Sequence, residues 1–316
     1  MRHCRDSIRK FNALPILLAH TKRRHSDPKS RETFLTAIDE FRQNSIYLAG
    51  AEIAERASAS IRLGECVCTF GYSSVVARVL ERAWFGPEAI HSSRAVLAGS
   101  SAESTSPPRQ QKTDVDRTRM PFSVLVVDSS PRFEGRYMLA RLTKAGIPCE
   151  YTHIGALPSL AHKVSLAVVG CHALLNNGYV LACIGTAMMA NIVSAVAHAP
   201  TLVCAETYKF WEQAHSDAFE YNELGDPDDL WRGPRGTSAD PNCGLVECSS
   251  VRNASLDDSV PDLSEWRTNP KLHLLHLTYD VLPPELVTAV VTEKGTLPTT
   301  SVPVVLRVKQ AASATF

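Results

Sequence analysis

Short apolar runs alternate with amphipathic segments along most of the chain. The runs CVCTF (66–70), FSVLVVD (122–128), VSLAVVG (164–170), TLVCAE (201–206) and LHLLHLTYD (272–280) are typical of buried strands, and PCEYTHI (148–154) predicts another strand. Helical spacing of apolar residues predicts helices over 73–85, 134–146, 184–199 and 283–295, and a short helix over 156–163. This alternation predicts an α/β fold with a parallel sheet covered by helices on both faces.

A helical region precedes this domain. Apolar residues recur at helical spacing from Arg31 to Leu63, and Gly64 is expected to end the helix. The segment 1–30 is basic and poor in acids; we favour a frayed or cropped start over an organelle transit peptide. We therefore expect a poorly ordered segment at 1–30, a helical region at 31–63 and an α/β domain at 64–316.

Two segments differ in composition from the rest of the α/β domain. Residues 86–121 are rich in Ser, Pro, Gly and charge, and residues 212–270 are acidic and full of Gly, Pro, Asn and Asp. Such compositions bury little apolar surface. We expect both segments to be insertions that lie outside the core.

Charge and hydropathy exclude some classes of partner. Thirty-three basic residues balance thirty-three acidic ones, so no long-range field favours nucleic acid or an anionic membrane. No apolar run reaches the roughly 20 residues that a spanning helix needs. We expect a cytoplasmic protein with no direct nucleic-acid or membrane contact.

The nine cysteines lack a repeated pair spacing, and Cys66, Cys68 and Cys204 lie in apolar strands, as reduced core thiols do. A zinc site at Cys243 and Cys248 is the alternative, but no second Cys or His pair stands at ligand spacing. We predict no metal.

Ligands of such sheets bind beyond the carboxyl ends of the strands, so we inspected the residues that follow each strand. Glycine and serine before a helix can offer N–H groups to an anion, and arginine can add charge, although helix capping and surface ion pairs explain the same residues. His172 can serve as acid or base, or can be a structural histidine. Phosphate-loop and dinucleotide fingerprints are absent, and we predict no cofactor. The candidate ligand-binding residues are Gly71, Ser73, Ser74, Arg136, His172, Asn177, Gly185, Thr186 and Asp280.

Four blocks in this order carry a family resemblance. They are TFGYSSVVARVLERA (69–83), VLVVDSSPRFEGRYMLARLTKAGIPCEY (124–151), VVGCHALLNNGYVLACIGTAMMA (168–190) and LTYDVLPPELVTAVVTEKGTLPTTSVPVVLR (277–307). Together they resemble delta-type members of the alpha/beta/delta family of eukaryotic translation initiation factor 2B. The resemblance covers roughly residues 45–85, 122–211 and 271–309. It implies a Rossmann-like fold shared with methylthioribose-1-phosphate and ribose-1,5-bisphosphate isomerases.

The resemblance also implies that the isomerase chemistry is missing. The isomerases carry a catalytic cysteine at the position of Gly71 and a catalytic aspartate at that of His172. They also place an acidic residue and a lysine where this chain has Tyr179 and Cys183. The resemblance also argues against a residual phosphate site, because delta-type members have arginine before the proline, where this chain has Ser130. Because proton transfer between sugar carbons needs a positioned acid/base pair, we expect no catalytic residue.

The implied function is that of a regulatory subunit of the guanine-nucleotide exchange complex that acts on initiation factor 2. The expected partners are beta-type and other subunits of initiation factor 2B and the alpha subunit of initiation factor 2. Two alternatives stay open: an isomerase with displaced catalytic residues, such as His172 and Asp280, and a sensor that binds a sugar phosphate or nucleotide without turnover. We also expect that the chain is not a stable monomer, because the predicted helix 184–199 and the segment SVPVVLRV (301–308) are strongly apolar. The alternative is that helix 184–199 is wholly buried within its own domain, next to strand 201–206.

Overall fold

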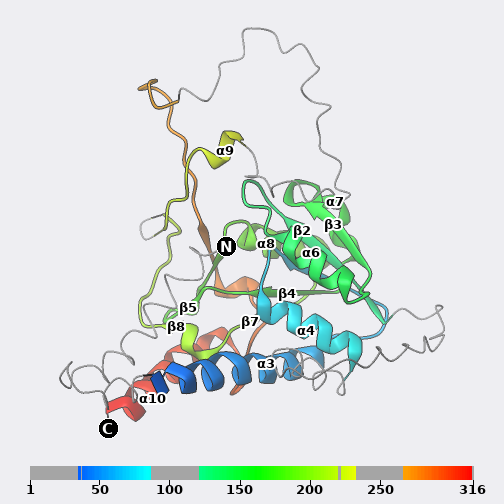
Figure 1. Cartoon of the computed structure of the whole chain (residues 1–316), viewed down its shortest axis with the longest axis vertical. Coiled ribbons are helices and arrows are strands. Elements are labelled where there is room, and N and C mark those ends of the chain that lie inside the picture. Colours follow the sequence, from blue (N-terminus) through cyan, green and yellow to red (C-terminus); the bar gives the residue numbers. More distant parts are fainter. Residues whose placement is uncertain (1–34, 37, 87–120, 220–221, 233–265, 315–316) are drawn as a thin grey trace, which may run out of the picture.

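The computed structural model describes residues 35–36, 38–86, 121–219, 222–232 and 266–314 (Figure 1). Its central element is a seven-stranded sheet. The strand order is β11-β10-β7-β4-β1-β2-β3. All neighbours are parallel except β10 and β11, which form an antiparallel pair. The predicted α/β class with a mainly parallel sheet is confirmed. The strands are β1 (Glu65–Phe70), β2 (Phe122–Asp128), β3 (Cys149–His153), β4 (Leu166–Gly170), β7 (Thr201–Cys204), β10 (Ala289–Thr292) and β11 (Gly295–Leu297).

Helices cover both faces of this sheet because successive side chains of a strand point to opposite faces. Val67 packs into one core with helices α3, α4 and α6, whereas Cys68 packs into a second core with α7, α8 and α10. The residues of both cores are buried, which is why the strands are apolar on both faces. The helices are α3 (Ala49–Ser58), α4 (Ser74–Phe85), α6 (Gly135–Lys144), α7 (Leu157–Leu160), α8 (Thr186–Ile192), α9 (Asp229–Arg232) and α10 (Val302–Ala314).

A second, four-stranded sheet has the order β8-β5-β6-β9. Strands β5 and β6 form an antiparallel hairpin, β9 pairs antiparallel with β6, and β8 pairs parallel with β5. The sequence did not predict this sheet: the hairpin strands are only three and four residues long and lie between the predicted strand 164–170 and the predicted helix 184–199, where no element was predicted. The strands are β5 (Ala173–Leu175), β6 (Val180–Cys183), β8 (Phe210–Trp211) and β9 (Tyr279–Leu282).

The predicted N-terminal helical region is present. A π-helical turn (Arg42–Leu48) leads into α3, whose Ile53 and Ala57 are fully buried. The helix ends at Ser58, before Gly64, which has a φ of +80° in the turn before β1. Glycine therefore serves a turn there and not the helix end that we expected. The division of the chain at residues 30 and 63 stays a prediction.

The predicted helix over 283–295 is wrong. Only a 3-10 turn (Pro284–Leu286) is helical, and the rest forms β10 and part of β11. Prolines at its start resembled a helix N-terminus, but Val290 and Val291 are β-branched and pair with β7. Pairing with the buried neighbouring strand therefore determines the conformation of this segment.

The predicted strand 272–280 is shifted and lies in the other sheet. The strand is β9, Tyr279–Leu282, and the residues before it join residues 222–229 in an arm that extends from the body (Figure 1). Within the arm, Leu224 bridges Leu277, and the Gly225 N–H donates to the His276 carbonyl (2.8 Å).

The outer end of the arm is closed by side chains. The buried carboxylate of Asp228 accepts hydrogen bonds from Trp266 Nε1 (3.0 Å) and from the Arg267 guanidinium (2.8 Å). Residues 222–232 and 266–270 of the expected insertion 212–270 thus make defined contacts. Residues 233–265 and most of the other expected insertion, 86–121, lie outside the described residues.

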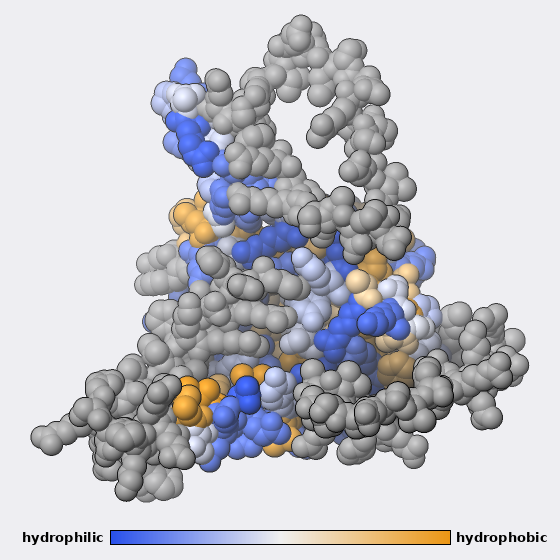
Figure 2. Space-filling model, in the orientation of Figure 1, coloured by the Kyte–Doolittle hydropathy of each residue, from blue (hydrophilic) through white to orange (hydrophobic). Residues whose placement is uncertain are grey.

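The apolar segments near the C-terminal half are partly buried. The predicted helix 184–199 begins at Thr186 and continues beyond α8 as a π-helical turn (Val193–Ala197). Met189, Ala190 and Val193 are buried, whereas Met188 and Val196 are exposed; on α10, Val304 and Val308 are exposed. On the face of the molecule drawn in Figure 2, apolar residues form separate patches among polar ones.

Among the described residues, no helix is long and apolar enough to cross a membrane.

Cys68 and Cys204 are buried free thiols, as expected, and Cys66 is half-buried. Burial raises the pKa of the Cys204 thiol to about 12. Cys243 and Cys248 lie outside the described residues.

Candidate functional site

A pocket lies at the carboxyl ends of β1 and β2, where ligands of such sheets bind. It has about 340 Å³, with the open solvent at its mouth included. We call it the β1–β2 pocket. It is lined by Phe70, Gly71, Asp128, Ser129, Ser130, Pro131, Arg132, Glu134, Cys183, Ile184, His276 and Thr278.

The turn from β1 to α4 forms one wall. Gly71 has a φ of +58°, and its N–H donates to the Val127 carbonyl (2.9 Å). A Cβ at Gly71 would meet no atom within 4 Å, so this position faces open space. Ser73 caps α4: its hydroxyl accepts from the Val76 N–H (3.5 Å). Ser74 is the first residue of α4, and neither serine lines the pocket.

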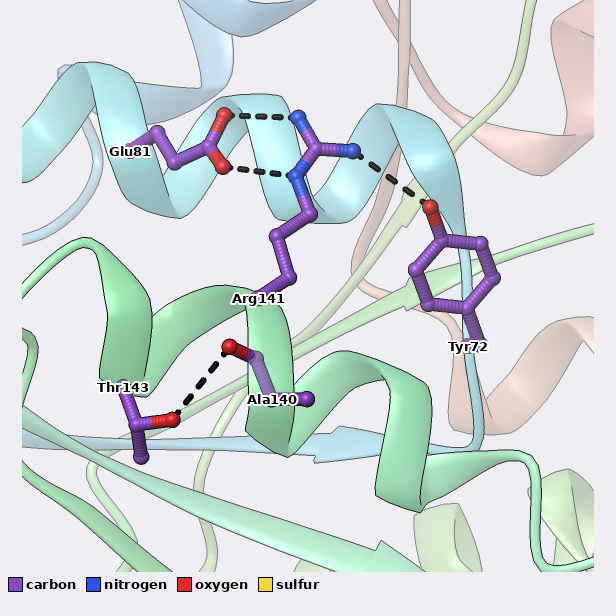
Figure 3. Close-up of polar contacts among 5 residues, drawn as sticks. All are labelled: Tyr72, Glu81, Ala140, Arg141 and Thr143. Carbon is purple, nitrogen blue, oxygen red and sulfur yellow. Dashed lines mark hydrogen bonds and ion pairs between the residues drawn. The ribbon is translucent and has the colours of Figure 1, made fainter. Parts of the chain in front are cut away.

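An ion pair holds this turn against the next helix (Figure 3). Arg141 of α6 donates from Nε and from a terminal nitrogen to the two carboxylate oxygens of Glu81 on α4, at 2.6 and 2.7 Å. Its third nitrogen lies 3.4 Å from the hydroxyl of Tyr72, which directly follows Gly71. The hydrogen bonds to Glu81 raise the pKa of Arg141. Arg141 therefore ties α4, α6 and the wall of the pocket together.

The loop after β2 forms the opposite wall. Asp128 is buried, and its carboxylate accepts from the Ser129 N–H and from the Tyr151 hydroxyl, both at 2.9 Å. Glu134 accepts from the Cys183 thiol (3.8 Å) and lies 3.7 Å from the Arg132 guanidinium. This wall is rich in acceptors, and sequence inspection placed none of these side chains in the candidate site.

The segment between β4 and α8, to which the sequence assigned neither strand nor helix, forms the β5–β6 hairpin. His172 lies before β5, and its ring packs edge-on against Tyr279 of β9 with 4.5 Å between the ring centroids. Burial lowers the pKa of His172 to about 3, and the charges of Lys209 and Arg132 act in the same direction. Asn177 lies at the hairpin turn, where its amide donates to the His215 carbonyl (2.9 Å).

Asp280 of β9 holds the start of α8. Its Oδ2 accepts from the Gly185 N–H (2.8 Å) and from the Ala187 N–H (2.9 Å), while the Thr186 hydroxyl donates to the Cys183 carbonyl (2.7 Å). Oδ1 is buried and has no hydrogen-bond partner within the described part of the chain. Burial raises the pKa of Asp280 to about 7, although the two N–H donors oppose this shift.

The nine predicted residues therefore do not form one cluster. Gly71 is the one that lines the pocket, whereas Gly185, Thr186 and Asp280 form a separate group at the start of α8. Arg136 is exposed, and its guanidinium stacks on the Phe133 ring at 4.6 Å. Ligand binding by the nine residues stays a prediction. In the described ranges, no three His, Cys, Asp or Glu side chains form a group that could hold a metal ion.

Comparison with known protein families identifies the family of this chain. The model of the initiation factor 2 subunit family matches residues 1–299. The chain belongs to this family. It is 31% identical over 281 residues to translation initiation factor eIF2B subunit delta of Schizosaccharomyces pombe, with 89% of this chain and 49% of that protein covered. The chain thus spans about half the length of this relative.

Other members of the family are enzymes. A ribose 1,5-bisphosphate isomerase of Pyrococcus furiosus is 27% identical over 180 residues, which are 56% of this chain and 45% of that protein. The fold matches the crystal structure of the tetrameric eIF2B-beta2-delta2 complex from C. thermophilum with a TM-score of 0.60 at 23% identity, over 90% of this chain and 70% of that one. The Rossmann-like fold expected from the resemblance is therefore confirmed.

Sequence inspection missed His276, which lines the β1–β2 pocket and is buried. It lies in the predicted strand 272–280, and a histidine within an apolar run is normally interpreted as a core residue. The signal that places it at the pocket is the pairing of the arm: its carbonyl binds Gly225, and its Nδ1 lies 2.9 Å from the Asp226 carbonyl. Such pairing over some 50 residues is invisible in a local pattern.

Proposed function

We propose that the chain is a non-catalytic, delta-like regulatory subunit of an initiation factor 2B guanine-nucleotide exchange complex. The observation that carries this proposal is the family membership together with the match to the delta subunit of S. pombe. Because the chain spans 49% of that protein, the role of the whole subunit is inferred for this chain and is tested below.

The geometry of the site supports a role without turnover. Gly71 offers no side chain where the isomerases have their cysteine, and the backbone there has a φ of +58°. His172 replaces the aspartate, and a group whose pKa is held at about 3 by burial is a weak base at neutral pH. The two positions that would need a nucleophile and an acid/base group thus carry neither.

The proposed partners are a beta-type subunit, further subunits of initiation factor 2B and the alpha subunit of initiation factor 2, in the cytoplasm. The tetrameric beta2-delta2 structure has this fold, and the exposed Met188, Val196, Val304 and Val308 offer this chain apolar surface for assembly. Assembly through such surface predicts that the chain alone is not a stable monomer.

Two experiments test the proposal. Affinity purification of the tagged chain should recover other subunits of initiation factor 2B. Size-exclusion chromatography with light scattering should show that the chain changes its mass on co-expression with a beta-type subunit. A well-behaved monomer that ignores the beta-type chain, with no subunit recovered from cells, would refute the assembly role.

A further inference from the structure

The arm that extends from the body carries large apolar side chains that the chain leaves uncovered (Figure 1). Leu224, on the segment that runs outward, is 67% exposed, and Leu275, on the segment that returns, is 51% exposed. The residues beside Leu275 on the opposite face of the returning segment, His276 and Thr278, are buried. The arm therefore has one covered face and one uncovered apolar face, and such a face is typical of a surface that a partner covers.

The arm is braced at both ends. At its base the Thr278 N–H donates to the Glu223 carbonyl (3.0 Å). At its outer end the buried Asp228 carboxylate accepts from Trp266 (3.0 Å) and from Arg267 (2.8 Å). The exposed leucines lie between these two points, so association through them does not first have to order the chain.

The exposed charges at the two ends of the arm have opposite signs. Glu223 lies at the base, directly before Leu224, and Lys271 lies at the outer end, four residues after Arg267; both are exposed. Lys271 stands seven positions before Thr278, the residue that pairs with Glu223. In an extended chain this separation is roughly 20 Å.

This order of acid, leucines and base is complementary to its own reverse. A twofold axis between two copies sets each surface against the same surface running in the opposite direction. Two arms laid side by side in this way bring Glu223 of each copy to Lys271 of the other, and the leucines meet between the two ion pairs. An apolar centre with a charged rim is the usual composition of a protein interface.

We propose that the arm is a self-association surface, through which two copies of this chain pair arm to arm about a twofold axis. Leu224 and Leu275 of both copies form the centre, and two ion pairs between Glu223 and Lys271 close the ends. This contact goes beyond the proposed subunit role, because it forms between copies of the chain alone and needs no beta-type subunit.

Sedimentation equilibrium of the full chain by itself, over a range of concentrations, tests the contact. The parent should show a monomer–dimer equilibrium. Leu224→Asp and Leu275→Asp should each weaken the dimer at least about tenfold, because each change acts on both copies and removes a buried leucine. The matched control is Leu63→Asp, which alters a leucine that is 80% exposed in the turn before β1 and should leave the equilibrium unchanged. A parent that stays monomeric, or leucine variants that dimerise as the parent does, overturns the proposal.

A charge exchange tests the arrangement of the two arms. At low salt, Glu223→Lys alone brings two lysines together at each end, and Lys271→Glu alone brings two glutamates together, so each should weaken the dimer about threefold. The double variant restores opposite charges at both ends and should recover the affinity of the parent. Effects on the fold of a single chain would add up in the double variant instead of cancelling. A double variant that dimerises more weakly than either single variant overturns the arm-to-arm arrangement. Binding of a beta-type subunit without any self-association would support the subunit role and overturn this inference.

Discussion

The free energy of unfolding of an Asp280→Asn variant, relative to that of the parent, should increase as the pH rises. The carboxylate holds the start of α8 through Gly185 and Ala187, so a simple inspection predicts that its loss is harmful. However, burial raises its pKa to about 7, which means that the folded state disfavours the charged form. Asparagine keeps an acceptor oxygen for the two N–H groups and carries no charge.

The magnitude follows from proton linkage. The pKa of an unfolded aspartate is about 3.9, so between pH 4 and 7 the folded state binds more protons than the unfolded state, and stability falls as the pH rises. With a folded pKa of about 7, the loss between pH 5 and pH 8 is about 3 kcal/mol. The asparagine variant lacks this loss. Its free energy of unfolding relative to the parent should therefore rise by about 3 kcal/mol over this range.

Urea unfolding of both proteins at pH 5, 6, 7 and 8 measures this difference. A constant offset between the two proteins is allowed, because the asparagine amide takes the place of Oδ1, which has no partner within the described part of the chain. The control Asp280→Ala removes the cap at every pH and should lose about 1 kcal/mol in acid, where the parent carboxyl is protonated. A difference between Asp280→Asn and the parent that does not change with pH would refute the reasoning.

Three further predictions concern the same region. Gly185→Ala should destabilise the chain by about 3 kcal/mol, because its φ is +104° and a Cβ would lie 2.4 Å from the Phe70 ring; urea unfolding measures this, and a loss below about 0.5 kcal/mol would contradict it. A double-mutant cycle on Arg141→Met and Glu81→Gln should give a coupling energy of about 1 kcal/mol, reduced in high salt because both side chains are partly exposed, and a coupling of zero would show that the pair in Figure 3 is not formed in solution. The purified chain should not interconvert methylthioribose 1-phosphate or ribose 1,5-bisphosphate above a buffer blank, and turnover that His172→Ala abolishes would count against the non-catalytic proposal.

Local sequence patterns correctly predicted the strands and helices whose conformation does not depend on a particular neighbouring element. The strands β1, β2, β4 and β7 are apolar on both faces, whichever strands they pair with. The start of helix α4 is marked in the sequence by its capping residue, Ser73. Local patterns failed where pairing between distant segments determines the conformation. In β10, Val290 and Val291 are compatible with a helix or a strand, and pairing with β7 makes the segment a strand. The candidate site was predicted less well, because Glu134 reaches the pocket from the loop after β2 and His276 from the arm, and no periodicity encodes either route.

The clasp of Asp228 with Trp266 and Arg267 has a consequence for changes in chain length. The clasp joins Asp228 to Trp266, which lies 38 positions further along the chain, so forming it carries the entropic cost of closing a loop. That entropy grows only slowly, by about 0.6 kcal/mol for each doubling of a flexible loop. A change in the number of residues between Asp228 and Trp266 should therefore alter the entropic cost of forming the clasp only slightly.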